Sequence, residues 1–162
     1  MKVVVLTGGI STERDVSLSS GKMIYEAVLG NGHQAVLLDV YFGYNGDDVE
    51  GIFEKDEDWA KEIGMVGEEN PDIEAVKALR KDGGKSYFGP NVIAICQAAD
   101  VVFMALHGDG ESGKIQAAFD LFGIQYTGAG YLGSALAMNK GISKRLFLEN
   151  SIPTPAGITM EQ

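Results

Sequence analysis

The stretch Lys2-Val3-Val4-Val5-Leu6-Thr7-Gly8-Gly9 decides the fold, because it leads an unbroken apolar run into a tight turn. A short apolar run without alternation is typical of a strand that is buried on both faces, as in a parallel sheet. We expect a helix next, roughly over 16–29, and a second buried strand over 35–40. A strand, a helix and a strand in this order predict a parallel pair joined by a right-handed crossover.

The periodicity of the residues after the first turn predicts this helix. Apolar residues recur there at steps of three and four, which is typical of a helix face that packs on a sheet. These residues are Val16, Met23, Ile24, Ala27 and Val28. Gly30-Asn31-Gly32 is expected to end the helix, since glycine and asparagine adopt the backbone conformations that close one.

A second unit of the same kind follows later in the chain. We expect helices over 91–98 and 114–122, strands over 101–106 and 124–127, and two helical segments over 132–138 and 142–149 that separate near Lys140-Gly141. The pattern predicts a three-layer α/β/α domain, Rossmann-like, with a mainly parallel sheet. We assign 1–128 to this domain and 129–162 to the beginning of a second one.

Negative charge is concentrated in the middle of the chain. The net charge is −10, and the segment from Asp47 to Glu74 holds 12 acidic and two basic residues, so the remainder is neutral. We interpret 47–89 as an acidic, insertion-like segment that is solvated and peripheral to any site, although Phe53, Trp59 and Ile63 indicate that part of it packs. The sequence has no basic patch that could follow a phosphate backbone or an anionic lipid surface, which argues against nucleic acid and membrane partners.

The cysteine content and the first residues indicate the compartment. Cys96 is the single cysteine, so an intrachain disulfide is excluded, and its apolar neighbours predict a core position. The apolar run at the start is too short for a membrane span or a signal peptide. We therefore expect a soluble, cytoplasmic protein.

Polar residues follow the first strand at the edge where open parallel sheets bind ligands. Gly8-Gly9-Ile10-Ser11 would allow close backbone approach, and Ser11 or Thr12 could cap the next helix. A tight turn with a helix cap explains the same residues equally well. Glu13 either is an acid favoured by the helix dipole or holds an ammonium group. The glycine spacing does not fit a dinucleotide-binding fingerprint.

The second candidate loop is His107-Gly108-Asp109-Gly110-Glu111-Ser112-Gly113, which follows the strand over 101–106. Its glycines indicate backbone amides exposed to a ligand. His107 is a candidate site residue because it stands directly after the strand. The other histidine, His33, lies in a turn without metal-ligand spacing, so we expect no metal site.

A small basic group, Lys140, Lys144 and Arg145, follows the segment over 132–138. Such a group is usually a solvated helix face. The alternative is contact with a phosphate, which needs compact positive charge near a helix end.

Four segments in order resemble the D-alanine–D-alanine ligases of the ATP-grasp family. Residues 8–21 (GGISTERDVSLSSG) resemble their opening motif, and residues 106–116 (LHGDGESGKIQ) resemble the second signature. Residues 126–130 (YTGAG) and 134–140 (SALAMNK) resemble the third, and residues 152–155 (IPTP) resemble the start of the central domain. The chain departs from the pattern at Ser112 and Asn139, where aspartate is usual, and in a loop after His107 that is one residue shorter.

The resemblance implies a pre-ATP-grasp domain over 1–128 and the first helices of the ATP-grasp region over 129–162. It implies a ligase that joins two D-alanines through an acyl phosphate for peptidoglycan precursor synthesis, with ATP and Mg²⁺ as cofactors of a cytoplasmic homodimer. Glu13 would then be catalytic and would anchor the ammonium of the first D-alanine, with Val16, His107 and Gly108 in the same subsite. Lys140 would contact ATP phosphate.

Members of the resembled family are roughly two domains long, at ~100–200 residues each. We therefore expect this chain to lack most of the ATP site, to bind no cofactor tightly and to be inactive alone. Two alternatives stay open. One is a free-standing small-molecule-binding or regulatory module of the same fold, and the other is part of a D-alanine–D-lactate or D-alanine–D-serine ligase.

Overall fold

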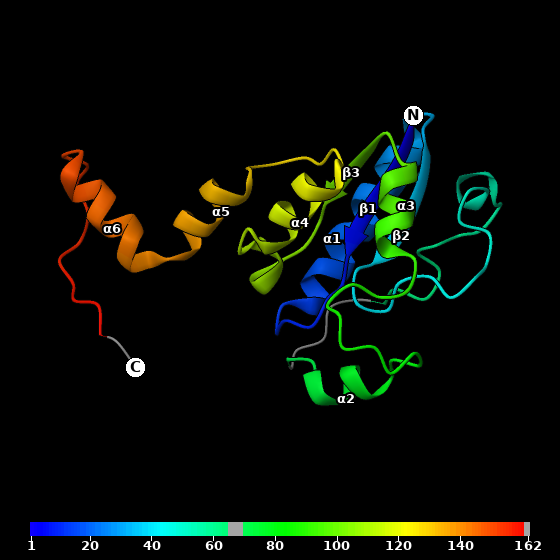
Figure 1. The fold of residues 1–162 in the computed structure, drawn as a ribbon, viewed down its shortest axis with the longest axis horizontal. Helices are drawn as coiled ribbons and strands as arrows, with labels where there is room; N and C mark the ends of the chain where they lie inside the picture. The colour runs from blue at the N-terminus through cyan, green and yellow to red at the C-terminus, as the bar shows by residue number, and fades with distance from the viewer. Residues whose placement is uncertain (65–69, 161–162) are drawn as a thin grey trace.

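The computed structural model describes residues 1–64 and 70–160 (Figure 1). Along the chain its elements are β1 (Lys2–Thr7), α1 (Arg14–Gly30), β2 (Gln34–Asp39), η1 (Ile52–Glu54), α2 (Ile73–Ala78), α3 (Val92–Ala98), β3 (Val101–Met104), η2 (Gly108–Glu111), α4 (Lys114–Phe122), α5 (Tyr131–Met138) and α6 (Lys140–Glu149). The strands β1 and β2 and the helices α1 and α4 agree with the predicted ranges to within two residues.

Three strands form a parallel sheet in the order β2–β1–β3. Lys2 of β1 pairs with Gln34 of β2, and Val3 of β1 pairs with Val101 of β3. The central strand β1 is buried from Val3 to Thr7, as expected for a strand with neighbours on both edges and helices on both faces. The predicted parallel α/β sheet is confirmed.

Helices cover both faces of this sheet, which gives three layers. On one face Val5 of β1 packs in a cluster with Tyr25 of α1. On the other face Leu6 of β1 packs with Ile95 of α3 and Phe119 of α4. Successive residues of a strand point to opposite faces, so one apolar strand supplies both clusters. Figure 1 shows β1 between α1 and α3.

The predicted range of α1 is right, and Ile24 and Val28 of its predicted apolar face pack against the cluster that contains Val5. The rest of the predicted face is wrong. Val16 and Met23 are exposed, at 42% and 63%. The residues that face the sheet are Arg14, Ser17, Gly21 and Tyr25. A side chain at Gly21 would place its Cβ 2.6 Å from the hydroxyl of Thr7, so the glycine lets the helix lie close to β1. Small and polar residues are therefore buried here, and an apolar periodicity cannot indicate that face.

The predicted strand over 124–127 is also absent, and a single parallel bridge between Val102 and Tyr126 takes its place. The N–H of Val102 donates to Gln125, and Thr127 donates back to Val102, at 2.8 and 3.0 Å.

The acidic segment contributes to the core, which corrects its interpretation as a solvated insertion. The prediction that Phe53, Trp59 and Ile63 pack is confirmed. Ile52 is fully buried and Phe53 is 5% exposed, and both belong to the cluster that contains Leu6. Helix α2, which the periodicity did not predict, buries no residue and begins at the capping residue Asp72. The part of the segment at 65–69 lies outside the described residues.

We expect Ile52→Val to destabilise the protein by about 0.5–1.5 kcal/mol, because a buried methyl group is lost and a small cavity remains. Urea unfolding followed by circular dichroism measures this change. Ile158→Val is the matched control, since Ile158 is 89% exposed and its replacement should leave the unfolding midpoint unchanged. Equal midpoints for the two variants would show that the acidic segment is not part of the core.

The last two helices bury no residue. They extend away from the sheet at the left of Figure 1. The helices separate at Asn139, one residue before the predicted break, because its side-chain oxygen accepts from the N–H of Ile142 at 3.0 Å and so begins α6. In the described parts of the chain, no helix is both long and apolar enough to cross a membrane.

Candidate functional site

The loop after β1 is fixed by a buried ion pair. The guanidinium of Arg14 lies 2.5 Å from the carboxylate of Asp39, with side chains only 8% and 15% exposed. The same guanidinium donates to the carbonyl of Gly9 at 2.6 Å. Asp39 also accepts from the N–H groups of Tyr41 and Phe42, at 2.8 and 3.1 Å. The ends of β1 and β2 are therefore held together directly beside Glu13.

Ser17 of α1 joins the ends of β1 and β3 to the helix. Its hydroxyl donates to the carbonyl of Ala105 at 2.7 Å and accepts from the N–H of Gly8 at 2.9 Å. The hydroxyl of Thr7 donates to the carbonyl of Ser17. Every polar atom in this buried contact has a partner, which makes the junction rigid.

Ser11 connects the two candidate loops. Its hydroxyl donates to the carbonyl of His107 at 3.1 Å and accepts from the N–H of Glu13 at 3.2 Å. Glu13 itself stands at the N-cap position of α1, and no side chain caps the helix there. Ser11 therefore holds the backbone of Glu13 next to the second loop. The predicted role of Ser11 or Thr12 as helix cap is wrong.

Gly108 lies in the left-handed region at a φ of 64°, which favours glycine. A Cβ atom here would approach the hydroxyl of Ser11 to 2.9 Å and a carboxylate oxygen of Glu13 to 3.1 Å. The N–H of Gly108 donates to the carboxylate of Glu111 at 3.1 Å. The absence of a side chain at Gly108 therefore leaves room for Glu13, and its backbone N–H holds the carboxylate of Glu111.

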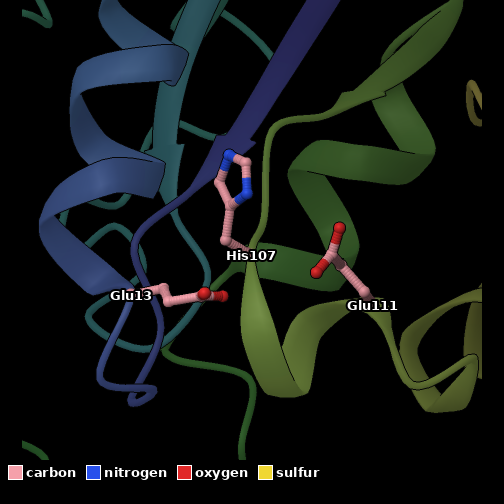
Figure 2. A group of neighbouring side chains, drawn as sticks. All are labelled: Glu13, His107 and Glu111. Carbon is pink, nitrogen blue, oxygen red and sulfur yellow. The ribbon is translucent and has the colours of Figure 1, made fainter. Parts of the chain in front are cut away.

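Three ligand-type side chains meet at this edge of the sheet. Glu13 comes from the start of α1, Glu111 from η2, and His107 stands between them (Figure 2). One carboxylate oxygen of each glutamate and one ring nitrogen of His107 all lie within 4.8 Å of one another. The other contact of the ring is made by its Nε2, which lies 3.3 Å from the hydroxyl of Ser20 on α1.

A cavity of about 530 Å³ opens beside the cluster. Glu13, Gly108, Asp109 and Glu111 line it from the two loops, and Lys140 lines it from the start of α6. Three carboxylates and one ammonium give this cavity a negative balance. Such a cavity suits a small cationic group more than an anion.

A neutral phenol stands behind the first loop. Burial raises the pKa of Tyr87 to about 12, and the nearby carboxylate of Asp109 adds to the effect. Burial likewise raises the pKa of Cys96 to about 12, in agreement with its predicted core position. Neither group carries a charge at neutral pH, so the cluster and Lys140 dominate the electrostatics of the site.

The structure brings most of the predicted site residues together. Glu13 and Gly108 line one cavity with Lys140, and the ring of His107 reaches the carboxylates. Val16 lies on an exposed part of α1 and does not line this cavity. Sequence reasoning did not single out Ser17, Asp39 or Glu111. Only Asp39 carried a signal, as a charged residue at the end of an otherwise apolar strand.

The family model described as the D-ala D-ala ligase N-terminus matches residues 2–129. A D-alanine–D-alanine ligase of Lacticaseibacillus casei is 49% identical over 157 residues, which are 95% of this chain and 43% of that protein. The crystal structure of the VanG D-Ala:D-Ser ligase of Enterococcus faecalis covers 96% of this chain and 43% of its own, with 25% identity and a TM-score of 0.62.

A crystal structure of a D-alanine–D-alanine ligase of Bacillus anthracis complexed with ATP is also similar in fold. It is 24% identical with a TM-score of 0.57, and the match covers 96% of this chain and 38% of that one. The chain thus spans less than half the length of the relatives that it matches.

Proposed function

The chain belongs to the D-ala D-ala ligase N-terminus family, and from this premise we propose that its cavity binds the first D-alanine of a D-alanine–D-alanine ligase. The whole enzyme would join two D-alanines through an acyl phosphate, for peptidoglycan precursor synthesis. The observation that carries the proposal is the carboxylate of Glu13, which forms no ion pair with any described residue and lines a negatively balanced cavity.

The ammonium of D-alanine is the group that this carboxylate recognises. Glu13 is held in place by its own N–H, which donates to Ser11, and Ser11 in turn donates to His107. The backbone of Glu13 is thereby fixed against the second loop before a ligand arrives, so that less backbone entropy is lost on binding. His107 and Gly108 shape the same subsite, whereas Val16 does not line the cavity.

Lys140 is proposed to contact a phosphate of ATP. It lies in the first turn of α6, where helix N–H groups also favour an anion. Among the described residues that line the cavity, Lys140 is the one cation and the other charged groups are carboxylates, which repel phosphate. The cavity therefore offers a single phosphate contact. ATP, when bound with Mg²⁺, supplies the phosphoryl group that activates the carboxylate of the first D-alanine. This chain alone should bind ATP at millimolar levels or more weakly.

The second substrate is D-alanine in this proposal. One structural neighbour is named as a D-Ala:D-Ser ligase, which keeps a D-serine-accepting ligase as the second candidate. The Glu13 subsite would serve both, since each reaction starts from D-alanine. The alternative is a small-molecule-binding or regulatory module of the same fold, which would bind a ligand in this cavity without catalysing the ligase reaction.

The proposed enzyme is a cytoplasmic homodimer without nucleic acid or membrane partners. The proposed division of the chain is at 128, with 129–162 in the ATP-grasp region. The lack of buried residues in α5 and α6 supports this division, because the core of 1–128 is complete without them.

Glu13→Gln should weaken binding of D-alanine by about tenfold, or roughly 1.5 kcal/mol, the lower end for a hydrogen bond to a charged group, since Glu13 is exposed to solvent. The substitution keeps the shape and removes the charge that faces the ammonium. NMR titration of the 162-residue chain with D-alanine measures the change. Glu26→Gln, on an exposed turn of α1, is the matched control, and equal affinities of the two variants would refute the role of Glu13.

A further inference from the structure

We propose that Glu13, His107 and Glu111 form a binding site for one divalent transition-metal ion of the Zn²⁺ class. Their ligand atoms lie within 4.8 Å of one another, and they come from two loops, Glu13 from the loop before α1 and His107 and Glu111 from the loop after β3. Ligand atoms around one zinc ion are roughly 3.5 Å apart, given bonds of about 2.0–2.2 Å in a tetrahedron. Both glutamates are exposed, so small changes of side-chain torsion close this difference.

The ring of His107 already has the orientation that such a site needs. Its Nε2 lies 3.3 Å from the hydroxyl of Ser20, which can accept a hydrogen bond from it. A histidine that binds a metal usually donates its other ring N–H to a neighbouring group, and this contact fixes the tautomer and the ring plane. In that tautomer Nδ1 carries the lone pair and is the ring nitrogen that remains to bind a metal ion.

The charges around the cluster favour a cation. Among the described residues, neither Glu13 nor Glu111 takes part in an ion pair, and two carboxylates this close repel each other. Glu111 uses one oxygen to accept from Gly108 and has the other free. A cation between the carboxylates relieves the repulsion. Lys140 lines the same cavity, and its ammonium donates instead to the carbonyl of Ala137 at 3.0 Å.

The ligand set selects the metal. One imidazole and two carboxylates suit Zn²⁺ and related ions, which accept nitrogen and oxygen in a four-coordinate site with one open position. Mg²⁺ requires near-octahedral oxygen coordination and keeps its waters, so this set does not suit it. The single thiol does not compete for zinc, because Cys96 is buried at 1% exposure.

The metal and a substrate ammonium would exclude each other, because both use Glu13. This consequence rests on the proposed function, whereas the metal site itself does not. A zinc ion would therefore act as a competitive inhibitor of D-alanine binding. The expectation of no metal site rested on the lack of a second histidine with metal-ligand spacing, and spacing along the sequence cannot show that Glu13 lies beside the loop of His107 and Glu111.

The test is isothermal titration calorimetry of the full 162-residue chain with ZnCl₂, and in parallel with MgCl₂. We expect one zinc ion per chain and no heat of binding with magnesium. His107→Gln and Glu111→Gln should each weaken zinc binding by roughly 10- to 100-fold or more, the loss that even an outer-shell partner causes. His33→Gln and Glu26→Gln are the controls and should bind zinc like the parent chain. Far-UV circular dichroism verifies that each variant is folded.

Three outcomes would overturn the site: no zinc binding, loss of binding in His33→Gln, or unchanged binding in the folded variants His107→Gln and Glu111→Gln. A repeat titration in the presence of saturating D-alanine separates the two proposals. A zinc affinity that falls by more than the chelation of zinc by free D-alanine accounts for, as measured by titrating ZnCl₂ into D-alanine alone, supports both. Zinc binding that depends on His107 but not on D-alanine supports the metal site and contradicts the proposed ammonium role of Glu13.

Discussion

Replacing Asp39 by asparagine is expected to lower the free energy of unfolding by about 3–5 kcal/mol, the typical effect of breaking a buried ion pair. The substitution keeps the size of the side chain. Its amide oxygen can still accept from the N–H groups of Tyr41 and Phe42, as the carboxylate does. The amide NH₂ group would then face the guanidinium of Arg14, so that two donors meet and a buried positive charge has lost its partner.

Chemical denaturation with urea measures this loss, and a second ion pair provides the control. Glu74→Gln removes the exposed partner of Lys77, and exposed pairs contribute little to stability, so no change is expected. If Asp39→Asn unfolds at the same urea concentration as Glu74→Gln, the Arg14–Asp39 pair does not hold the loop after β1. The positioning of Glu13 would then need another explanation.

The sheet could be predicted from the sequence because its signals are local. Each of β1 and β2 is an apolar run of about six residues, and a strand buried on both faces needs nothing else. The carboxyl ends of parallel strands meet at one edge, so the loops that carry Glu13 and His107 had to lie near each other. The resemblance to the D-alanine–D-alanine ligases, whose motifs occur in the same order, independently placed Glu13 and His107 in one subsite.

The parts that could not be predicted depend on contacts between distant residues. Ser17 is buried in α1 because Ala105 and Gly8 supply hydrogen-bond partners, and Ala105 is 88 residues away. Ile52 and Phe53 are in the core although the surrounding segment is acidic, because their side chains meet the cluster on one face of the sheet. Hydrophobic periodicity does not register the burial of Ser17, and in the acidic segment it indicated only that part of the segment packs. Glu111 could not be distinguished from the other polar residues of its loop by sequence, because only the fold brings it close to Glu13.

The 162-residue chain, incubated with ATP, Mg²⁺ and D-alanine, is expected to make no measurable D-alanyl-D-alanine. The reason is the charge of the cavity. A triphosphate carries about four negative charges that cations must neutralise before a phosphoryl group can be transferred. The described residues that line the cavity offer one ammonium, Lys140, against the carboxylates of Glu13, Asp109 and Glu111. A single cation exposed to solvent contributes little affinity.

Phosphate release and dipeptide formation are the two measurements, and the second excludes simple hydrolysis of ATP. Lys140→Ala should change neither, because a background rate does not depend on a site. Turnover of about 1 per second or more, in the range of ordinary enzymes, together with its loss in Lys140→Ala, would mean that this cavity neutralises a triphosphate after all. The ammonium-binding role argued from its negative balance would then have lost its physical basis.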